Sequence, residues 1–232
     1  MVSVTFLPAK KNLTKLKIAI TGTAGSGKTH SALLMAGGIA EKIAVLDTEN
    51  GSSNLEVGKK DVPQFDVVTM NAPYLTEKYL ATIDSAIEGG YDLLIIDSLS
   101  HGWAGTGGLL EQKENIDKAK KGNSYTNWAT ITKKQNELIA KIISANIHII
   151  VTMRSKSDYI LTENEKGYQV PKKIGLAPVQ REGVDYEFTT VFDLDQQSHL
   201  YSVSKDRTSL FDGFSDKITK ATGEKFLAWL NS

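Results

Sequence analysis

The segment that most constrains the fold is the glycine-rich octapeptide at residues 22–29, GTAGSGKT, which matches the pattern G-x-x-x-x-G-K-[ST] in full. Glycine suits such a loop because backbone N–H groups wrap a polyphosphate and side chains would block that approach. The Lys28 ammonium would contact the β- and γ-phosphates, and the Thr29 hydroxyl would bind Mg²⁺. An apolar segment precedes the loop and a helical pattern follows it, so the motif predicts a nucleoside triphosphate site. The residues expected to hold the nucleotide are Gly22, Thr23, Ala24, Gly25, Ser26, Gly27, Lys28 and Thr29.

The composition of the 232 residues is that of an ordinary folded protein, with 41% hydrophobic and 23% charged residues. Lysine plus arginine (27) equals aspartate plus glutamate (27), so only a local basic patch could attract nucleic acid. The absence of cysteine excludes disulfides, thiolate zinc sites and a cysteine nucleophile. The sequence shows no signal-peptide pattern and no apolar segment long enough to cross a bilayer. We therefore expect a cytoplasmic protein without a membrane partner.

Short β-branched segments alternate with longer helical patterns, which is typical of a mainly parallel, twisted sheet flanked by helices. We expect an α/β fold with an antiparallel strand pair near the C-terminal end, in one domain over residues 1–232. Residues 98–123 are expected to be irregular, and a hairpin is expected around residues 165–167. The expected strands are residues 16–20, 43–46, 66–70, 93–96, 147–152, 189–194 and 200–204. The expected helices are residues 29–41, 76–88, 125–145 and 222–230, the last with Phe226, Leu227 and Leu230 inward.

Carboxylates that follow two of the predicted strands are candidates for the chemistry. A P-loop needs an acidic residue at the end of a neighbouring buried strand to hold the Mg²⁺ water shell, and Asp97 ends the run LLIID. The segment LDTENG ends another strand, at the edge of the sheet where ligands bind in such folds. Glu49 could there orient and deprotonate the attacking water. Asp47 is the alternative for that role, unless it hydrogen-bonds the backbone of its own turn.

These motifs together resemble the RecA-like ATPases, which share a P-loop, a D-x-E segment after the following strand and an aspartate that ends the strand LLIID. The stretch at 178–213 is similar to the end of the core in the bacterial RadA and DnaB-like branch, and the chain looks most like short phage-encoded RecA-core ATPases of annealing and recombination. The resemblance covers about residues 16–213 and implies a RecA-like P-loop NTPase core that uses ATP and Mg²⁺. It also supports Glu49 as the hydrolytic base.

The resemblance implies that Lys205 and Arg207 reach into the nucleotide site of a neighbouring subunit, whereas the residues alone indicate two exposed charges at a strand end. An arginine finger is worth about 10³ to 10⁵ in rate, so we expect a weak ATPase as a monomer and a stronger one when assembled. One departure concerns the γ-phosphate sensor, which in the family is commonly glutamine or asparagine. Here the sequence reads Thr152-Met153-Arg154, of which Thr152 or Arg154 could substitute.

The resemblance further implies that two loops after the central strands, residues 98–123 and 154–173, face single-stranded DNA. Both carry basic residues interleaved with aromatic ones, a pattern that suits phosphate contact and base stacking. Acidic residues lie among them, so solvated mixed-charge loops are the alternative. The candidate DNA contacts are Lys118, Lys120, Lys121, Arg154, Lys156, Lys172 and Lys173.

The leading hypothesis is an Mg²⁺-dependent ATPase that binds single-stranded DNA and assists recombination or strand annealing. Its expected partners are DNA, further copies of the chain in a ring or filament, and a single-stranded-DNA-binding or annealing protein, in the host cytoplasm if the protein is phage-encoded. The alternatives are a DnaB-like ring helicase motor, a P-loop small-molecule kinase, and a nucleotide-controlled assembly protein that never contacts DNA.

Overall fold

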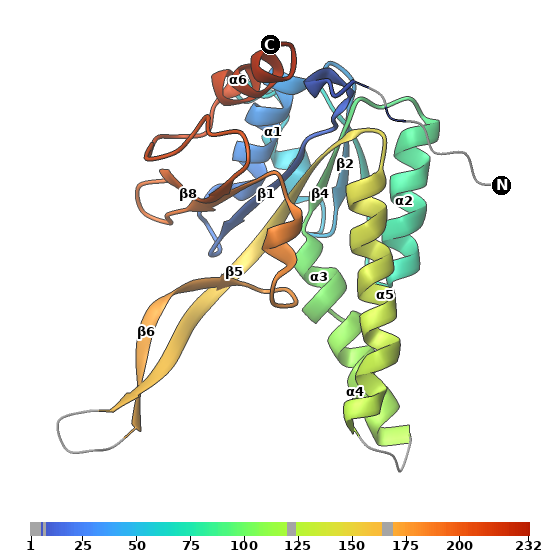
Figure 1. Ribbon diagram of the computed structural model, residues 1–232. Coiled ribbons are helices and arrows are strands. Elements are labelled where there is room, and N and C mark those ends of the chain that lie inside the picture. The colour runs from blue at the N-terminus through green and yellow to red at the C-terminus, as the bar shows by residue number, and fades with distance from the viewer. Residues whose placement is uncertain (1–5, 7, 120–123, 164–168) are drawn as a thin grey trace.

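The computed structural model describes residues 6, 8–119, 124–163 and 169–232. At its centre lies a twisted sheet whose strands follow the order β3-β2-β4-β5-β1-β7-β8 (Figure 1). Neighbouring strands from β3 to β7 are parallel, whereas β8 is antiparallel to β7 and β6 is antiparallel to β5. The expected α/β class, with an antiparallel pair near the C-terminal end, is confirmed. The strands are β1 (Lys17–Gly22), β2 (Ile43–Asp47), β3 (Asp66–Thr69), β4 (Leu93–Asp97), β5 (His148–Glu163), β6 (Gln169–Pro178), β7 (Thr190–Leu194) and β8 (Tyr201–Asp206).

Helices cover both faces of the sheet because the central strands present apolar side chains on both sides. In β1, Ile18 and Ile20 belong to the buried cluster formed with α1 and α6, whereas Ala19 belongs to the cluster formed with α2 and α5. β4 is buried along its whole length, as expected for a central strand. The helices are α1 (Lys28–Ile39), α2 (Thr76–Glu88), α3 (Leu99–Ala104), α4 (Leu109–Ala119), α5 (Ser124–Ser144) and α6 (Lys220–Leu230), with short 3₁₀ turns η1 (Lys11–Leu13), η2 (Ser52–Glu56) and η3 (Val184–Glu187).

Helices α1 and α6 approach so closely that their contact requires glycine. A Cβ atom at Gly38 would lie 2.1 Å from the carbonyl oxygen of Lys220, and one at Gly223 would lie 2.0 Å from that of Met35. Neither distance can be accommodated in a close-packed interior. The contact therefore fixes the C-terminal helix against the helix that begins at the P-loop.

Residues 98–123 were expected to be irregular, and this is wrong for the described part, which forms α3 and α4. Glycines between the two helices interrupt the helical spacing of apolar residues in the sequence. In the structure, Trp103 and Leu109 pack with Ile131 of α5 in a small separate buried cluster. This tertiary packing stabilises helices that the local pattern does not predict. The expectation that Leu227 faces inward is also wrong: its side chain is 39% exposed, while Phe226 and Leu230 are buried.

Two arms project from the sheet at the end where the parallel strands finish (Figure 1). One is the helical pair α4–α5, and the other is the β5–β6 hairpin, in which β5 continues to Glu163 rather than ending at Thr152 as expected. The predicted turn at residues 165–167 lies outside the described residues. No helix in the described ranges is long and apolar enough to cross a membrane. Both arms start directly beyond the strands that carry the candidate site.

His148, the first residue of β5, makes the fold sensitive to pH. Its Nδ1 accepts a hydrogen bond from the backbone N–H of Leu16 at 3.0 Å and must therefore be unprotonated. Burial, together with the charges of Lys15 and Lys17, lowers the pKa of His148 from 6.5 to about 4. Because the folded-state pKa is the lower one, the unfolded chain takes up the proton first as the pH falls between these values, and stability is lost.

We predict that the free energy of unfolding falls less in His148→Gln than in the wild type when the pH is lowered from about 7 to about 5. The difference should be roughly 2 kcal/mol, and the glutamine amide oxygen can still accept the hydrogen bond from Leu16. Denaturant unfolding followed by circular dichroism at the two pH values measures this difference. An identical pH-dependent loss in both proteins would contradict the assignment.

Candidate functional site

The P-loop joins the end of β1 to the start of α1, and glycine gives it its shape. Gly25 and Gly27 have φ angles of 79° and 87°, in the left-handed region that other residues rarely adopt. Gly22 is required for another reason, since a Cβ atom there would lie 2.3 Å from Ser26 Oγ. Because α1 begins at Lys28, one residue earlier than expected, Lys28 and Thr29 occupy its first turn. The positive end of the helix dipole therefore faces the loop.

The turn between β7 and β8 supports the P-loop. Gln196 donates a hydrogen bond from Nε2 to the carbonyl oxygen of Ala24 at 2.9 Å, and His199 Nδ1 lies 3.2 Å from the carbonyl oxygen of Ser26. These bonds engage carbonyl oxygens of the loop and so hold its backbone in one orientation. Sequence reasoning missed both residues, because they contact positions 172 and 173 residues away and no local motif marks them.

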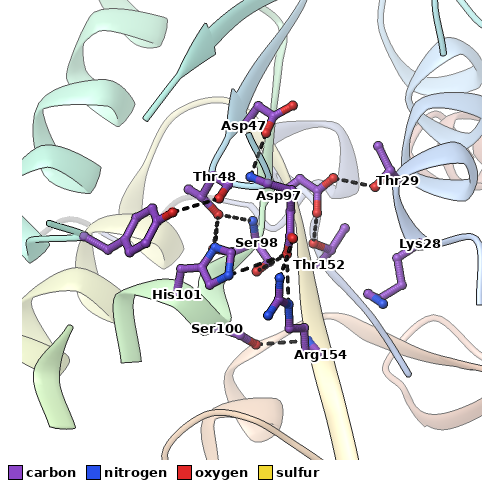
Figure 2. A network of polar contacts seen from close by, with 12 residues as sticks. Lys28, Thr29, Asp47, Thr48, Asp97, Ser98, Ser100, His101, Thr152 and Arg154 are labelled. Atoms are coloured by element: carbon purple, nitrogen blue, oxygen red, sulfur yellow. Dashed lines mark hydrogen bonds and ion pairs between the residues drawn. The ribbon is translucent and has the colours of Figure 1, made fainter. Parts of the chain in front are cut away.

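The carboxylate of Asp97 lies where a metal-binding residue is expected. Thr29 donates from Oγ1 to Asp97 Oδ2 at 2.6 Å, and Thr152 donates from Oγ1 to Asp97 Oδ1 at 2.5 Å (Figure 2). Asp97 is only 1% exposed, and this burial raises the pKa of its carboxyl, although the two hydroxyls oppose the change. A hydroxyl and a carboxylate side by side are oxygen ligands of the kind that Mg²⁺ prefers. The residues present therefore fit a magnesium ion.

Asp47 and Glu49, the two candidates for the base, occupy different environments. Asp47 is fully buried, and its carboxylate accepts bonds from the backbone N–H groups of Glu49 (2.7 Å), Gly51 (3.2 Å) and Ser53 (2.8 Å) and from Ser53 Oγ (2.5 Å). These bonds use the lone pairs of Asp47, which organises its own turn. Glu49 is instead partly exposed and lines the cavity beside the P-loop. Of the two, Glu49 has the carboxylate that is open to a ligand.

Glu49 belongs to a polar network that joins three elements of the fold. Figure 2 labels its partners Ser98, His101 and Arg154. The Arg154 guanidinium at the base of the β5–β6 hairpin binds both carboxylate oxygens of Glu49. Ser98 Oγ donates to Glu49 at 3.3 Å, and His101 Nε2 on α3 lies 3.9 Å from it. Burial alone would raise the pKa of Glu49, but the hydrogen bond and charge of Arg154 outweigh it, so this pKa is lowered. Glu49 is therefore ionised at neutral pH.

His101 is a third residue that sequence reasoning missed. Its Nδ1 lies 2.8 Å from Thr48 Oγ1, and its ring stacks on Tyr74 with the centroids 4.7 Å apart. Tyr74 in turn donates to the carbonyl oxygen of Thr48 at 3.2 Å. Burial lowers the pKa of His101, although the charge of Glu49 opposes this change. The only local signal is its position four residues after Asp97, in the first turn of α3.

Thr29, Glu49, Asp97 and Arg154 line one cavity of about 670 Å³, which is within the size range of small-molecule sites. Lys28 lines it and donates to the carbonyl oxygen of Thr23 at 2.8 Å. Burial lowers the pKa of Lys28, while the charges of Asp97 and Glu49 act in the opposite direction. A hollow of similar volume, about 680 Å³, lies between α5 and η3 but contains no part of the P-loop. The cavity at the P-loop is therefore the candidate nucleotide site.

Comparison with known families decides the class of this site. A model of the AAA domain matches residues 14–219, which is most of the chain. The chain belongs to the AAA domain family. No curated protein shows a significant match to it. The AAA domain indicates a P-loop ATPase, in agreement with the nucleotide site built from residues 22–29.

Among the other predicted site residues whose side chains the structure describes, Arg154 lines the nucleotide cavity of this AAA domain, whereas the four discussed next do not. Lys205 and Arg207 both donate to the carbonyl oxygen of Tyr186 in η3. Lys118 on α4 and Lys156 on β5 are exposed on the two arms. Lys120 and Lys121 lie outside the described residues, and Lys172 and Lys173 are placed only as backbone positions of β6.

We predict that Asp47→Asn lowers the free energy of unfolding by about 2–4 kcal/mol. The amide NH₂ of asparagine is a donor, and it would face backbone N–H groups whose hydrogen bonds the carboxylate now accepts. Glu49→Gln should cost less than about 1 kcal/mol, since its contacts are partly exposed. Urea unfolding without nucleotide compares the two variants. Equal losses would show that Asp47 does not organise the turn.

Proposed function

We propose that this AAA domain is a RecA-like ATPase that hydrolyses ATP with Mg²⁺, binds single-stranded DNA, assists recombination or strand annealing, and has ATP sites completed by a neighbouring subunit. One observation carries the ATPase part: the Thr29 hydroxyl lies 2.6 Å from the Asp97 carboxylate, in a cavity that also contains Lys28 and Glu49. These side chains supply the phosphate contact, the metal ligands and the base of phosphoryl transfer to water. The RecA-like class and the DNA function extend this core and are tested below.

The chain's own residues divide the reaction between them. The loop amides and Lys28 hold the phosphates, and Mg²⁺ bound by Thr29 and by Asp97 through its water shell would neutralise charge that develops on their oxygens. Ionised Glu49 accepts a proton from water as the water oxygen attacks the γ-phosphorus. The bond from that phosphorus to the β–γ bridging oxygen breaks, and ADP leaves with the bonding electrons.

Arg154 connects this chemistry to the arms. Its guanidinium binds Glu49 and lines the same cavity, so an incoming γ-phosphate competes with Glu49 for it. Its backbone N–H donates to Ser100 Oγ in α3 at 2.9 Å. Arg154 stands at the base of the β5–β6 arm and Ser100 in the helix before the α4–α5 arm. This arrangement supports DNA binding that responds to the nucleotide.

The placement of Lys205 and Arg207 supports action on a neighbour rather than on their own site. The β7–β8 turn contacts the P-loop, whereas Lys205 pairs with Val191 and Arg207 follows at the far end of β8. A strand of this length spans about 17 Å, so these side chains lie too far from their own phosphates. Arg207 is exposed and Lys205 is half-buried at this end of β8, a position that instead suits a site on a second copy, through a head-to-tail contact.

We predict that Glu49→Gln and Arg207→Ala each abolish most ATPase activity while leaving nucleotide binding, and that mixing the two variants restores part of it. In a mixed head-to-tail assembly, about a quarter of the contacts pair an intact Glu49 with an intact Arg207. Phosphate release, measured for each variant and for the mixture at the same total concentration, tests this. Lys28→Ala mixed with Glu49→Gln is the control, because both changes lie in the same subunit's half of the site and no contact in that mixture has both residues intact.

Absence of recovery in the Glu49→Gln and Arg207→Ala mixture would remove the subunit-bridging site. Full activity of Arg207→Ala alone would remove the finger and leave Glu49 untouched.

The DNA proposal predicts that single-stranded DNA stimulates ATP hydrolysis several-fold and that binding weakens with salt. Replacing Lys118 and Lys156 together by alanine should reduce the slope of log affinity against log salt by about 1.4, because two phosphate contacts are lost. Filter binding between about 50 and 200 mM salt measures the slope. The double variant Lys10→Ala/Lys225→Ala removes the same charge elsewhere and should leave the slope unchanged.

A salt-independent, weak affinity in the wild type would contradict DNA binding. Transfer of phosphate to a small acceptor in place of water would favour the kinase alternative.

A further inference from the structure

The ring of His101 on α3 is held in one orientation by residues that do not line the nucleotide cavity. Its Nδ1 lies 2.8 Å from Thr48 Oγ1 (Figure 2), and the ring stacks on Tyr74 with an angle of 19° between the two planes. Tyr74 also donates a hydrogen bond to the carbonyl oxygen of Thr48, which closes the group. The second ring nitrogen, Nε2, therefore has a fixed direction. It faces Glu49, at 3.9 Å from Oε1.

The hydrogen bonds of Thr48 determine which nitrogen of His101 carries the proton. Thr48 Oγ1 accepts from the backbone N–H of Ser98 at 2.8 Å, and its hydroxyl has one proton to donate. That proton can go to His101 Nδ1 at 2.8 Å or to the carbonyl oxygen of Ser98 at 3.3 Å, and the shorter contact favours His101. Burial lowers the pKa of His101, so the ring is neutral at neutral pH. Its single proton then lies on Nε2, the nitrogen that faces Glu49.

The two carboxylate oxygens of Glu49 have different partners. Among the described residues, Arg154 is the only donor to Oε2. Oε1 accepts from Arg154 Nε at 3.0 Å and from Ser98 Oγ at 3.3 Å, and His101 lies on the same side. The backbone of Glu49 is held by Asp47, so only its side chain can turn. When an incoming γ-phosphate draws Arg154 away, Oε2 loses its donor, whereas Oε1 keeps Ser98 and needs to move by only about 1 Å to bind His101.

We propose that His101 is a positioning residue for the base: its Nε2–H binds Glu49 Oε1 once Arg154 has released the carboxylate, and Oε2 is left to take the proton of the attacking water. The inference rests on the proposed ATPase function and adds a residue to it. The Nε2 proton stays on His101 throughout, so the proton of the water passes only to Oε2. Correct aim matters because a misplacement of about 1 Å can cost about a hundredfold in rate.

A neutral donor suits this role better than the guanidinium that it replaces. The hydrogen bond and charge of Arg154 lower the pKa of Glu49, which keeps the carboxylate ionised but makes it a weaker base. Neutral His101 orients Oε1 without adding a positive charge. Burial, which raises the pKa of Glu49, then becomes the main influence. Glu49 is thus a stronger base beside His101 than beside Arg154, and it gains this strength only when a nucleotide is present to displace the guanidinium.

The test uses two substitutions that each keep one nitrogen position of the ring. The amide group of asparagine reaches the position of Nδ1, and that of glutamine, one methylene longer, reaches the position of Nε2. Phosphate release by the full chain is measured across ATP concentrations with excess Mg²⁺. His101→Asn keeps a partner for Thr48 and should lower kcat about 10- to 100-fold, with the KM for ATP within about twofold of the wild type. His101→Gln restores the donor to Glu49 and should lower kcat by no more than about threefold.

A double variant shows whether His101 acts through Glu49. In the Glu49→Gln protein the base is absent, so adding His101→Asn should lower the residual kcat by less than about twofold. A further loss as large as the one in the wild-type background would place the action of His101 elsewhere and overturn the inference.

The remaining outcomes separate this inference from the function on which it rests. A wild type that does not hydrolyse ATP, or a fully active Glu49→Gln, would overturn the proposed base itself. Equal kcat values of His101→Asn and His101→Gln would overturn only the role of His101. If these variants do not fold, a crystal structure of the wild type with Mg²⁺ and adenylyl imidodiphosphate decides. A distance from Nε2 to Oε1 of about 3.2 Å or less supports the inference, and one that stays near 3.9 Å overturns it.

Discussion

The buried carboxylate of Asp97 is the interaction on which the rest of the site depends. One oxygen accepts from Thr29 in the first turn of α1, and the other accepts from Thr152 on β5. Because β5 lies between β4 and β1, this bonding ties the P-loop helix, which follows β1, to β4, a strand that is not adjacent to β1 in the sheet. A carboxylate that is 1% exposed is costly unless its lone pairs are satisfied, and here hydroxyls satisfy them. The same oxygens that maintain this bonding are those that a Mg²⁺ ion would use.

Asp47 and Glu49, the two acidic residues of the turn after β2, have different roles: Asp47 is structural, whereas Glu49 is the proposed catalytic group. Asp47 gives its lone pairs to the turn and leaves Glu49 facing the cavity. Arg154 then keeps Glu49 ionised by lowering its pKa, at the cost of occupying the oxygens that a water molecule needs. In the proposed function Glu49 is the base, and the negative charge of a γ-phosphate would compete with it for the guanidinium. The proposed chemistry and its proposed control therefore both involve the ion pair between Glu49 and Arg154.

How much the sequence predicts depends on how local each feature is. The P-loop, Asp97 and the alternation of strands and helices follow from contiguous residues, and most strand and helix positions are right to within a few residues. Asp47 and Glu49 could not be separated, because the choice depends on the fold of the turn. Arg154 was noticed for its position, but its bond to Glu49 joins residues 105 apart. Gln196, His101 and His199 carry no local signal, and α3 and α4 depend on packing against α5 rather than on their own pattern.

The antiparallel pair β7–β8 links the features that local sequence could not connect. At one end its turn contacts the P-loop through Gln196 and His199, and at the other end Lys205 and Arg207 contact Tyr186. Thr190 Oγ1 donates to Asp206 at 3.0 Å, and Arg207 N–H donates to the carbonyl oxygen of Thr189 at 3.0 Å, so the far end is also bonded to β7. The two short strands are thus hydrogen-bonded to each other along their length and at the far end. The surface that we propose to face a neighbour is therefore bonded to the same strand pair that supports the chain's own phosphate loop.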